Sequence, residues 1–257
     1  VRASRQLSSL PEIGRAADGG ELRVHYQPRC VAAGTRAVGT GALLRWQQPV
    51  LGMLAPNVFI PIAERSGLVL PIGEWVRDQA CGQLRTWHDS GHPEWTMAVN
   101  LSPLQFSSPS LVDNVRDVLA RHGIAPQRLT QEITETTAMK DVEASLAILN
   151  DLTAMGVHIS IDDFGTGYSS LLYLKRMPAT ELKIDRAFVR DLEQNAEDAA
   201  IVSSIVALGR SLQLQVVAEG VETREQQEYL SGLGCDQLQG YHLGRPMDPD
   251  EFLRKVG

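Results

Sequence analysis

Short apolar runs alternate with amphipathic stretches along almost the whole chain, and this alternation predicts its secondary structure. The runs are rich in aliphatic and β-branched residues, which is typical of buried strands. The stretches between them carry apolar residues at helical spacing, as at Val142, Leu146 and Leu149. Strands are expected at 22–31, 37–46, 95–101, 129–135, 159–163, 181–185, 215–221 and 237–243. Helices are expected at 56–66, 71–89, 110–122, 141–155, 198–212, 223–232 and 248–256, with a short one after residue 170.

Strands that alternate with helices over this length predict an α/β protein with a (β/α)8 barrel of the TIM type. An open doubly wound sheet is the alternative, but no G-x-G-x-x-G motif stands at a first strand–helix turn. Residues 1–20 are expected to be a lead-in helix or linker from an upstream region, ending at Asp18-Gly19-Gly20. Residues 21–257 have no break in composition and are expected to form one domain.

Composition and charge exclude several classes of protein. The formal net charge is −7, so the surface is not a general binder of nucleic acid or of anionic membranes. Cys30, Cys81 and Cys235 are few and far apart, which indicates a reduced, cytoplasmic protein rather than a disulfide framework. No apolar run approaches the roughly 20 residues of a membrane-spanning helix, and no signal peptide is visible. Because the chain opens at Val1, we expect it to be cut from a longer protein, which can itself be attached to a membrane.

Two adjacent carboxylates, Asp162 and Asp163, stand where a buried strand is expected to surface. The apolar run Ile159–Ile161 precedes them, and a loop punctuated by Gly165 and Gly167 follows. Neighbouring acids repel each other and resist desolvation unless a positive charge lies between them. A divalent cation would supply that charge, whereas the simpler interpretation is an Asp pair that caps the next helix.

Polar side chains recur at the ends of the other predicted strands. The carboxyl ends of the strands of a (β/α)8 barrel meet at one mouth, where such enzymes place their chemistry. Exposed strand ends are often polar because they face water, so any one of these residues is weak evidence for a functional site. Their joint recurrence favours a shared site. The residues at these ends are Arg45, Asn100, Glu132, Glu135, Asp162, Asp163, Lys183, Asp185, Glu219, Glu222 and Gln239.

The side chains in this set are mostly oxygen donors, which suit Mg²⁺ or Mn²⁺ and not zinc. The six His residues are scattered without H-x-x-x-H spacing. Carboxylates with a divalent cation and a lysine suggest one of two reactions. Hydrolysis of a phosphodiester would use two metals to activate water and neutralise the phosphate. Proton abstraction next to a carboxylate would use Lys183 as the base. The residues by themselves favour the first reaction only modestly.

A series of short motifs gives the chain a more specific likeness. With them the chain resembles the EAL-domain family of bacterial cyclic di-GMP phosphodiesterases, from about Leu22 to Phe252. In order, the motifs are Tyr26-Gln27-Pro28, Ala42-Leu43-Leu44-Arg45-Trp46, Asn100-Leu101-Ser102-Pro103, Glu132-Ile133-Thr134-Glu135, Asp162 to Ser170, Lys183-Ile184-Asp185, Ala218-Glu219-Gly220-Val221-Glu222 and Gln239-Gly240-Tyr241.

The resemblance implies a variant (β/α)8 barrel whose mouth binds cyclic di-GMP and hydrolyses it to linear pGpG with two Mg²⁺ or Mn²⁺ ions. It assigns the metal site to Asn100, Glu132, Asp162, Asp163 and Glu219. It assigns substrate binding to Gln27, Arg45, Asp163 and Gln239, and catalysis to Lys183, Glu219 and Asp185. Glu135 and Glu222 would support the loop 163–170, which in the family couples the metal site to the dimer interface.

One position departs from the family pattern. The triplet that names the family is Glu-Ala-Leu, and here it reads Gly41-Ala42-Leu43. The resemblance implies that the missing Glu is a direct metal ligand. Loss of a residue that only orients a ligand costs roughly 10–100-fold in metal affinity or activity, and loss of a ligand is expected to cost at least as much. Water can fill the gap, since Mg²⁺ readily keeps waters.

We therefore expect a cyclic di-GMP phosphodiesterase domain with weakened catalysis. The alternative is a catalytically inactive domain that acts as a cyclic di-GMP receptor. A third hypothesis is an interaction module whose partner docks on the outer helices. The resemblance also implies a homodimer, and upstream sensory or GGDEF-type domains in the full-length protein.

Overall fold

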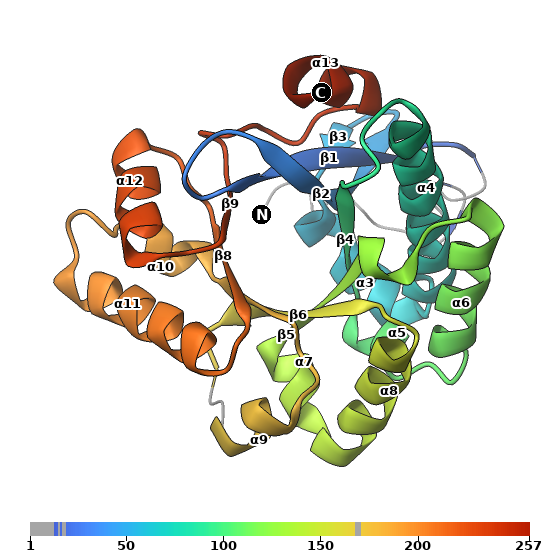
Figure 1. Cartoon of the computed structure of the whole chain (residues 1–257). Helices are drawn as coiled ribbons and strands as arrows, with labels where there is room; N and C mark the ends of the chain where they lie inside the picture. The colour runs from blue at the N-terminus through green and yellow to red at the C-terminus, as the bar shows by residue number, and fades with distance from the viewer. Residues whose placement is uncertain (1–12, 15, 17–18, 168–170) are drawn as a thin grey trace.

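In the computed structural model, a sheet of nine strands curls until its first strand pairs with its second, and helices surround the closed barrel (Figure 1). The structure describes residues 13–14, 16 and 19–257, apart from 168–170. The predicted lead-in helix at 1–20 lies for the most part outside the described residues. The (β/α)8 fold expected from the sequence is confirmed.

The bounds of the elements are as follows. The strands are β1 (Leu22–Val31), β2 (Ala37–Gln48), β3 (Gly52–Leu54), β4 (Thr96–Asn100), β5 (Leu129–Thr134), β6 (His158–Phe164), β7 (Glu181–Ile184), β8 (Gln215–Glu219) and β9 (Gln237–Gln239). The helices are α3 (Pro56–Ser66), α4 (Val69–Asp89), α5 (Pro103–Phe106), α6 (Leu111–His122), α7 (Glu135–Lys140), α8 (Val142–Ala154), α9 (Leu171–Arg176), α10 (Arg186–Arg190), α11 (Ala196–Ser211), α12 (Arg224–Leu233) and α13 (Pro249–Val256), with a 3-10 turn at Pro126–Arg128.

The barrel departs from a fully parallel one at its first strand. β2 and β4 to β9 run parallel in the order of the chain, whereas β1 is antiparallel to both of its neighbours, β2 and β9. The segment 32–36 between β1 and β2 is too short for a helical crossover, so the two strands form a hairpin. β3 pairs only with the far end of β2 and lies outside the barrel.

The apolar pattern locates the barrel strands and the long helices within a few residues of their bounds. β9 is shorter than predicted, because the chain turns at Gly240 and the Leu243 amide donates to the Gly240 carbonyl at 3.1 Å. A side chain at Gly240 would overlap the backbone of Val221, so glycine is required there. β3, α5, α7 and α10 are not predicted, since elements this short show no hydrophobic period.

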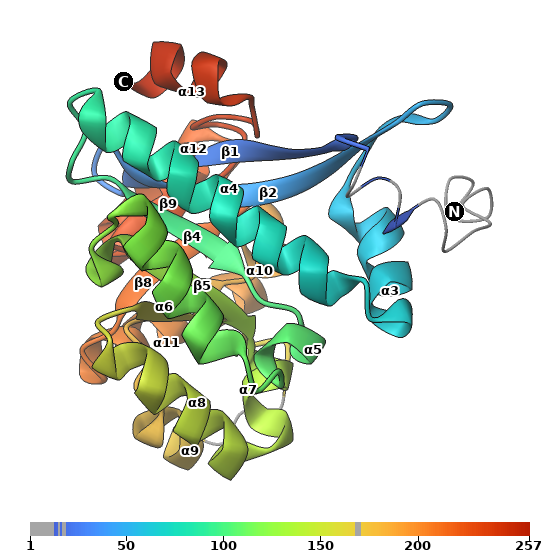
Figure 2. The ribbon, with the colours of Figure 1, turned by 90° about the vertical axis from the view of Figure 1, so that its right-hand side faces the viewer.

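An aromatic cluster fastens the last helix to the barrel. Phe252 of α13 is fully buried and stacks on Trp87 of α4, with ring centroids 4.7 Å apart. Trp95, just before β4, meets Phe252 edge-on at 5.4 Å. The cluster lies at the end of the barrel where β4 begins, opposite the ends at which the parallel strands terminate (Figure 2).

Cys30, Cys81 and Cys235 are buried free thiols, as expected for a chain without a disulfide framework. Among the described residues, no helix combines the length and the apolar character needed to cross a membrane.

Truncation of Phe252 tests the role of the aromatic cluster. We expect Phe252→Ala to lower the free energy of unfolding by about 3–5 kcal/mol, because the cavity that it leaves is closed in by large rings. Urea denaturation measures this value. The control is Tyr229→Ala on α12, where the ring is 41% exposed and the expected change is within about 0.5 kcal/mol. Equal effects of the two changes would contradict a fastening role for the cluster.

Candidate active site

The carboxyl ends of the parallel strands enclose a cavity of about 320 Å³ at the mouth of the barrel. Most of the side chains singled out in the sequence line this cavity, although they come from eight different strands and a loop. The structure brings together Gln27, Arg45, Asn100, Glu132, Asp162, Lys183, Glu219, Glu222 and Gln239, and Gly41 lies among them. Their convergence is a fact of the fold, whereas the role of each residue stays a prediction.

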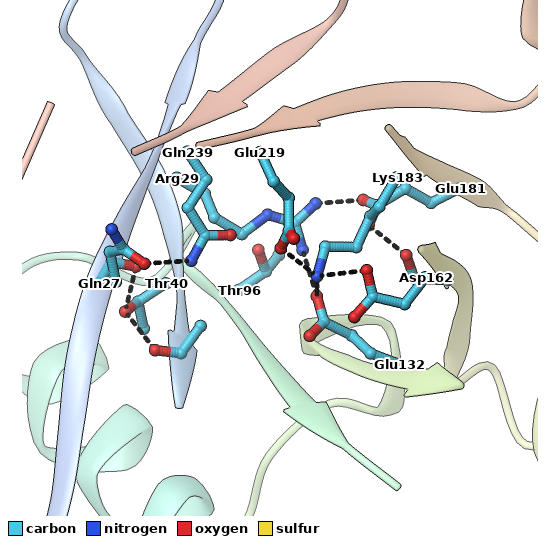
Figure 3. Close-up of polar contacts among 12 residues, drawn as sticks. Gln27, Arg29, Thr40, Thr96, Glu132, Asp162, Glu181, Lys183, Glu219 and Gln239 are labelled. Atoms are coloured by element: carbon cyan, nitrogen blue, oxygen red, sulfur yellow. Dashed lines mark hydrogen bonds and ion pairs between the residues drawn. The ribbon is translucent and has the colours of Figure 1, made fainter. Parts of the chain in front are cut away.

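Lys183 is the centre of this cavity's charge network. Its ammonium nitrogen lies 2.8 Å from Glu132 Oε1, and the Lys183 side chain is only 2% exposed. The same nitrogen lies 3.2 Å from Asp162 Oδ1 and 2.6 Å from Glu219 Oε1 (Figure 3). One buried cation therefore faces three carboxylates from three other strands, so the site carries more negative than positive charge.

Strand register places these groups at one height. In β4 and β5, Asn100 lies opposite Glu132, and in β8 and β9, Glu219 lies opposite Gln239. Alternate residues of a strand point to opposite faces, so the side chains that point inward reach the same space from each strand. Lys183 points inward from β7 in this way.

Burial and mutual repulsion shift the protonation of the acids. Burial raises the pKa of Glu132, and the charge of Asp162 adds to this shift, although Lys183 opposes it. Burial, followed by the charges of Asp162 and Glu132, raises the pKa of Glu219 to about 7 against the pull of Lys183. Burial by itself lowers the pKa of Lys183, but the three carboxylates overcome it and raise that pKa well above its usual value. Lys183 is thus held as an ammonium ion.

Asp162, Asp163 and Glu219 form a compact acidic cluster. One carboxylate oxygen from each lies within 4.8 Å of the others. Asp163 has a φ of 53°, in the left-handed region that Asp tolerates, and its amide donates to Asp162 Oδ1 at 2.9 Å. Burial and the nearby Asp162 raise the pKa of Asp163 to about 7. These oxygens could hold a divalent cation.

Three predicted residues lie beside the cavity or at its rim. Asp185 caps α10 by accepting from the Ala187 amide at 2.6 Å, and its proximity adds to the raised pKa of Asp163. Glu135 is buried under the loop after β6, where its Oε2 accepts from the Gly165 amide at 2.9 Å. Glu222 is exposed at the rim, and its support of the loop stays a prediction. Part of that loop, 168–170, falls outside the described residues.

A second charged layer beneath the cavity was not anticipated from the sequence. Arg29 of β1 crosses the barrel to form an ion pair with Glu181 of β7, and both residues are buried. Ser160 donates to the other oxygen of Glu181 at 2.7 Å, and Arg29 Nη1 lies 4.0 Å from Glu132 (Figure 3). The only signal in the sequence is a charged residue inside an apolar run, because its partner stands 152 positions away.

Gly41 lies in β2, between Gln27 of β1 and Ala98 of β4, and it lines the cavity. A Cβ atom at this position would lie 2.9 Å from the amide nitrogen of Gln239. The space next to Gly41 is therefore taken up by the end of the Gln239 side chain. That end is flexible, so a larger residue at position 41 requires Gln239 to move.

Comparisons of the sequence and the fold with those of known proteins show which family the chain resembles. The family model described as "EAL domain" matches residues 12–246. The bifunctional diguanylate cyclase/cyclic di-GMP phosphodiesterase MucR of Pseudomonas aeruginosa is 56% identical over 256 residues, which is 100% of this chain and 37% of that protein. The cyclic di-GMP phosphodiesterase NbdA of the same organism is 40% identical, over 99% of this chain and 33% of its own length. This chain thus spans about a third of the length of these relatives.

A solved structure titled "PaMucR Phosphodiesterase, c-di-GMP complex" matches this fold with a TM-score of 0.92 and 56% identity. The match covers 95% of this chain and 98% of that one. An EAL enzyme named Bd1971, in a form bound to cAMP and cyclic di-GMP, matches with a TM-score of 0.93 and 36% identity, over 100% of this chain and 70% of its own. The family match and these identities agree over almost the whole chain, which therefore belongs to the EAL domain family.

Proposed function

We propose that this chain is a cyclic di-GMP phosphodiesterase domain that opens the cyclic dinucleotide to linear pGpG, with turnover weakened by Gly41. The observation that carries the proposal is the match, along nearly all of both chains, to a MucR phosphodiesterase structure titled as a cyclic di-GMP complex. The cavity at the barrel mouth is the place where the ligand would bind.

The cavity suits a ligand with two phosphates and two bases. Arg45 lines it, and a guanidinium can grip a phosphate with two parallel hydrogen bonds. A second, largely apolar cavity of about 530 Å³ adjoins it and shares Leu43 and Asn100 with it. The flat faces of the bases would pack against such apolar side chains, while the phosphates would lie beside the charged groups.

The donor set at the mouth fits a divalent cation. The cluster of Asp162, Asp163 and Glu219 offers hard oxygen ligands, which Mg²⁺ and Mn²⁺ prefer, and Glu132 and Asn100 adjoin it. The raised pKa values of Asp163 and Glu219 indicate negative charge that a cation would neutralise. When bound, the cations would neutralise the phosphate and lower the pKa of the attacking water.

The protein's own groups would orient the reactants. Because Lys183 is held as an ammonium ion, it donates hydrogen bonds and is a poor base. This charge state favours phosphodiester hydrolysis over proton abstraction by Lys183. In the proposed reaction Lys183 orients the attacking water, and Arg45 holds a phosphate. Glu135 fixes the loop after β6 through the Gly165 amide and so keeps Asp163 in place.

A receptor is the second candidate function, and Gly41 is the observation that favours it. Glycine removes a carboxylate from the mouth while the rest of the charged set remains. Such a site would still bind cyclic di-GMP but would hydrolyse it more slowly. Because the relatives are longer proteins, we further propose that this domain works with upstream sensory or GGDEF-type domains. A homodimer and a cytoplasmic location also stay predictions.

Replacing Gly41 with Glu distinguishes a weakened phosphodiesterase from a receptor. With cyclic di-GMP and Mn²⁺, we expect the unaltered chain to release pGpG slowly. We expect Gly41→Glu to accelerate this release roughly 10-fold or more, because an impaired metal site lowers activity by at least that factor. Chromatography of the nucleotides measures both rates. Gly232→Glu on α12, where nothing lies within 4 Å of an added Cβ, is the matched control. Tight binding without any product would establish the receptor, and rapid turnover by the unaltered chain would contradict weakened catalysis.

Arg45 provides a test of ligand binding that is independent of turnover. We expect Arg45→Ala to weaken cyclic di-GMP binding roughly 10–100-fold, which corresponds to loss of a charge-assisted hydrogen bond. Arg45→Lys should recover only part of the affinity, because an ammonium cannot form two parallel bonds. Calorimetry with EDTA present measures binding without hydrolysis. Arg254→Ala on the exposed face of α13 serves as the control. An unchanged affinity for Arg45→Ala would refute a phosphate contact.

The raised pKa values predict that cation binding releases protons near neutral pH. Because the pKa values of Asp163 and Glu219 are raised to about 7, both acids are partly protonated near neutral pH and must lose their protons to bind a cation. We therefore expect cation binding to release more protons at pH 7 than at pH 9. Mg²⁺ titrations by calorimetry, in buffers with different ionisation enthalpies, count these protons. Release that does not change between the two pH values would contradict the assignment of these two acids.

A further inference from the structure

We infer that the side-chain amide of Gln239, whose nitrogen fills the space beside Gly41, presents its carbonyl oxygen to the cavity as an additional, neutral ligand for the divalent cation at the barrel mouth. The inference rests on the proposed function for the presence of a cation. It concerns how this chain, with glycine at position 41, completes the site.

The orientation of the Gln239 amide follows from a short chain of hydrogen bonds. Gln27 Nε2 donates to the Gly244 carbonyl at 3.0 Å, which leaves Gln27 Oε1 as an acceptor. Gln239 Nε2 donates to that oxygen at 3.2 Å. The backbone carbonyl of Gly244 thus determines which way both amides face. Figure 3 shows the bond from Gln239 to Gln27, which turns Gln239 Oε1 away from Gln27.

The Gln239 oxygen is a buried acceptor: Gln239 is only 5% exposed, and its Oε1 has no hydrogen-bond donor among the described residues. A buried carbonyl without a partner costs about 1–3 kcal/mol, so such a group is expected to have a ligand. Gln239 lines the acidic cavity, and it lies opposite Glu219 on the neighbouring strand. The unsatisfied acceptor is therefore next to the carboxylates that could hold a cation.

Gly41 and the position of Gln239 depend on each other. The Gln239 amide nitrogen lies 2.9 Å from the place of a Cβ on Gly41, and Gln239 Oε1 lies 3.9 Å from it. A side chain at position 41 would require the end of Gln239, which donates to Gln27, to shift. The present position of Gln239 thus depends on the space that glycine leaves.

The chemistry of an amide oxygen suits this role. Mg²⁺ and Mn²⁺ accept amide carbonyls as ligands, although more weakly than carboxylates. Gln239 would replace the oxygen that Gly41 cannot offer, but it would not replace its charge. The site would therefore bind a cation with one negative charge less than a site with Glu at position 41.

Four proteins test the inference through Mn²⁺ affinity, without nucleotide and without turnover. They are the unaltered chain, Gln239→Ala, Gly41→Glu and the double variant. The electron paramagnetic resonance signal of free Mn²⁺ gives the dissociation constant of Mn²⁺ from each protein. We expect Gln239→Ala to weaken Mn²⁺ binding roughly 10-fold or more in the unaltered chain and less than about 2-fold in the Gly41→Glu background, where the carboxylate displaces the amide.

Two further variants separate ligation from packing. Gln239→Glu keeps the shape and adds charge, and we expect it to tighten Mn²⁺ binding above that of the unaltered chain. Gln131→Ala is the matched control. Gln131 is a fully buried glutamine of β5 whose amide also lacks a hydrogen-bond partner in the part of the chain that the structure describes, but it does not line the cavity. Thermal melts of all the variants report whether folding is retained, and Gln131→Ala should leave Mn²⁺ affinity unchanged.

Three outcomes would overturn the inference. One is an unchanged Mn²⁺ affinity in Gln239→Ala. Another is an equal loss in both backgrounds, which would mean that Gln239 acts independently of Gly41. The third is no Mn²⁺ binding by the unaltered chain. Cyclic di-GMP binding with EDTA present is measured separately, so failure of the Gln239 inference is distinguishable from failure of the proposed function.

Discussion

The structure depends on a single buried ammonium, that of Lys183, which lies within 3.2 Å of carboxylates from three other strands. Removing one partner from a buried ion pair leaves an uncompensated charge, which is far more costly than loss of an exposed pair. The network therefore requires the strands to be in register. At the same time it leaves surplus negative charge at the mouth, which makes the site receptive to cations. Stability and chemistry are coupled through the same atoms.

Below the Lys183 network lies a second set of buried charges, which joins different strands. Arg29 and Glu181 join the first strand of the barrel to the seventh, and Arg29 also approaches Glu132 from beneath. Where most barrels fill this depth with branched apolar side chains, here a charged pair crosses the interior. The reversed first strand is thus tied to Glu132, a carboxylate that lines the cavity, as well as to its two neighbours in the sheet. In this way the closure of the barrel and the arrangement of the acids are linked.

The alternation of apolar runs with amphipathic stretches predicts the barrel, because its parallel strands are buried on both faces and its long helices on one. The gathering of polar residues at strand ends followed from the parallel order. The direction of β1 was not predicted, although the short segment 32–36 contained the reason. The pairing of Arg29 with Glu181 could not be predicted, since it exists only once the barrel closes. The direction in which the Gln239 amide faces depends on the Gly244 carbonyl, a contact that no local pattern encodes.

The hairpin of β1 and β2 has a consequence for the way the domain is attached. Because β1 runs against its neighbours, its first residue, Leu22, lies opposite Trp46, one position beyond Arg45. The chain therefore enters β1 at the end of the barrel where the acidic cavity lies, whereas α13 lies at the opposite end (Figure 2). β1 thus joins this point of entry to the strand that carries Gly41 and Arg45.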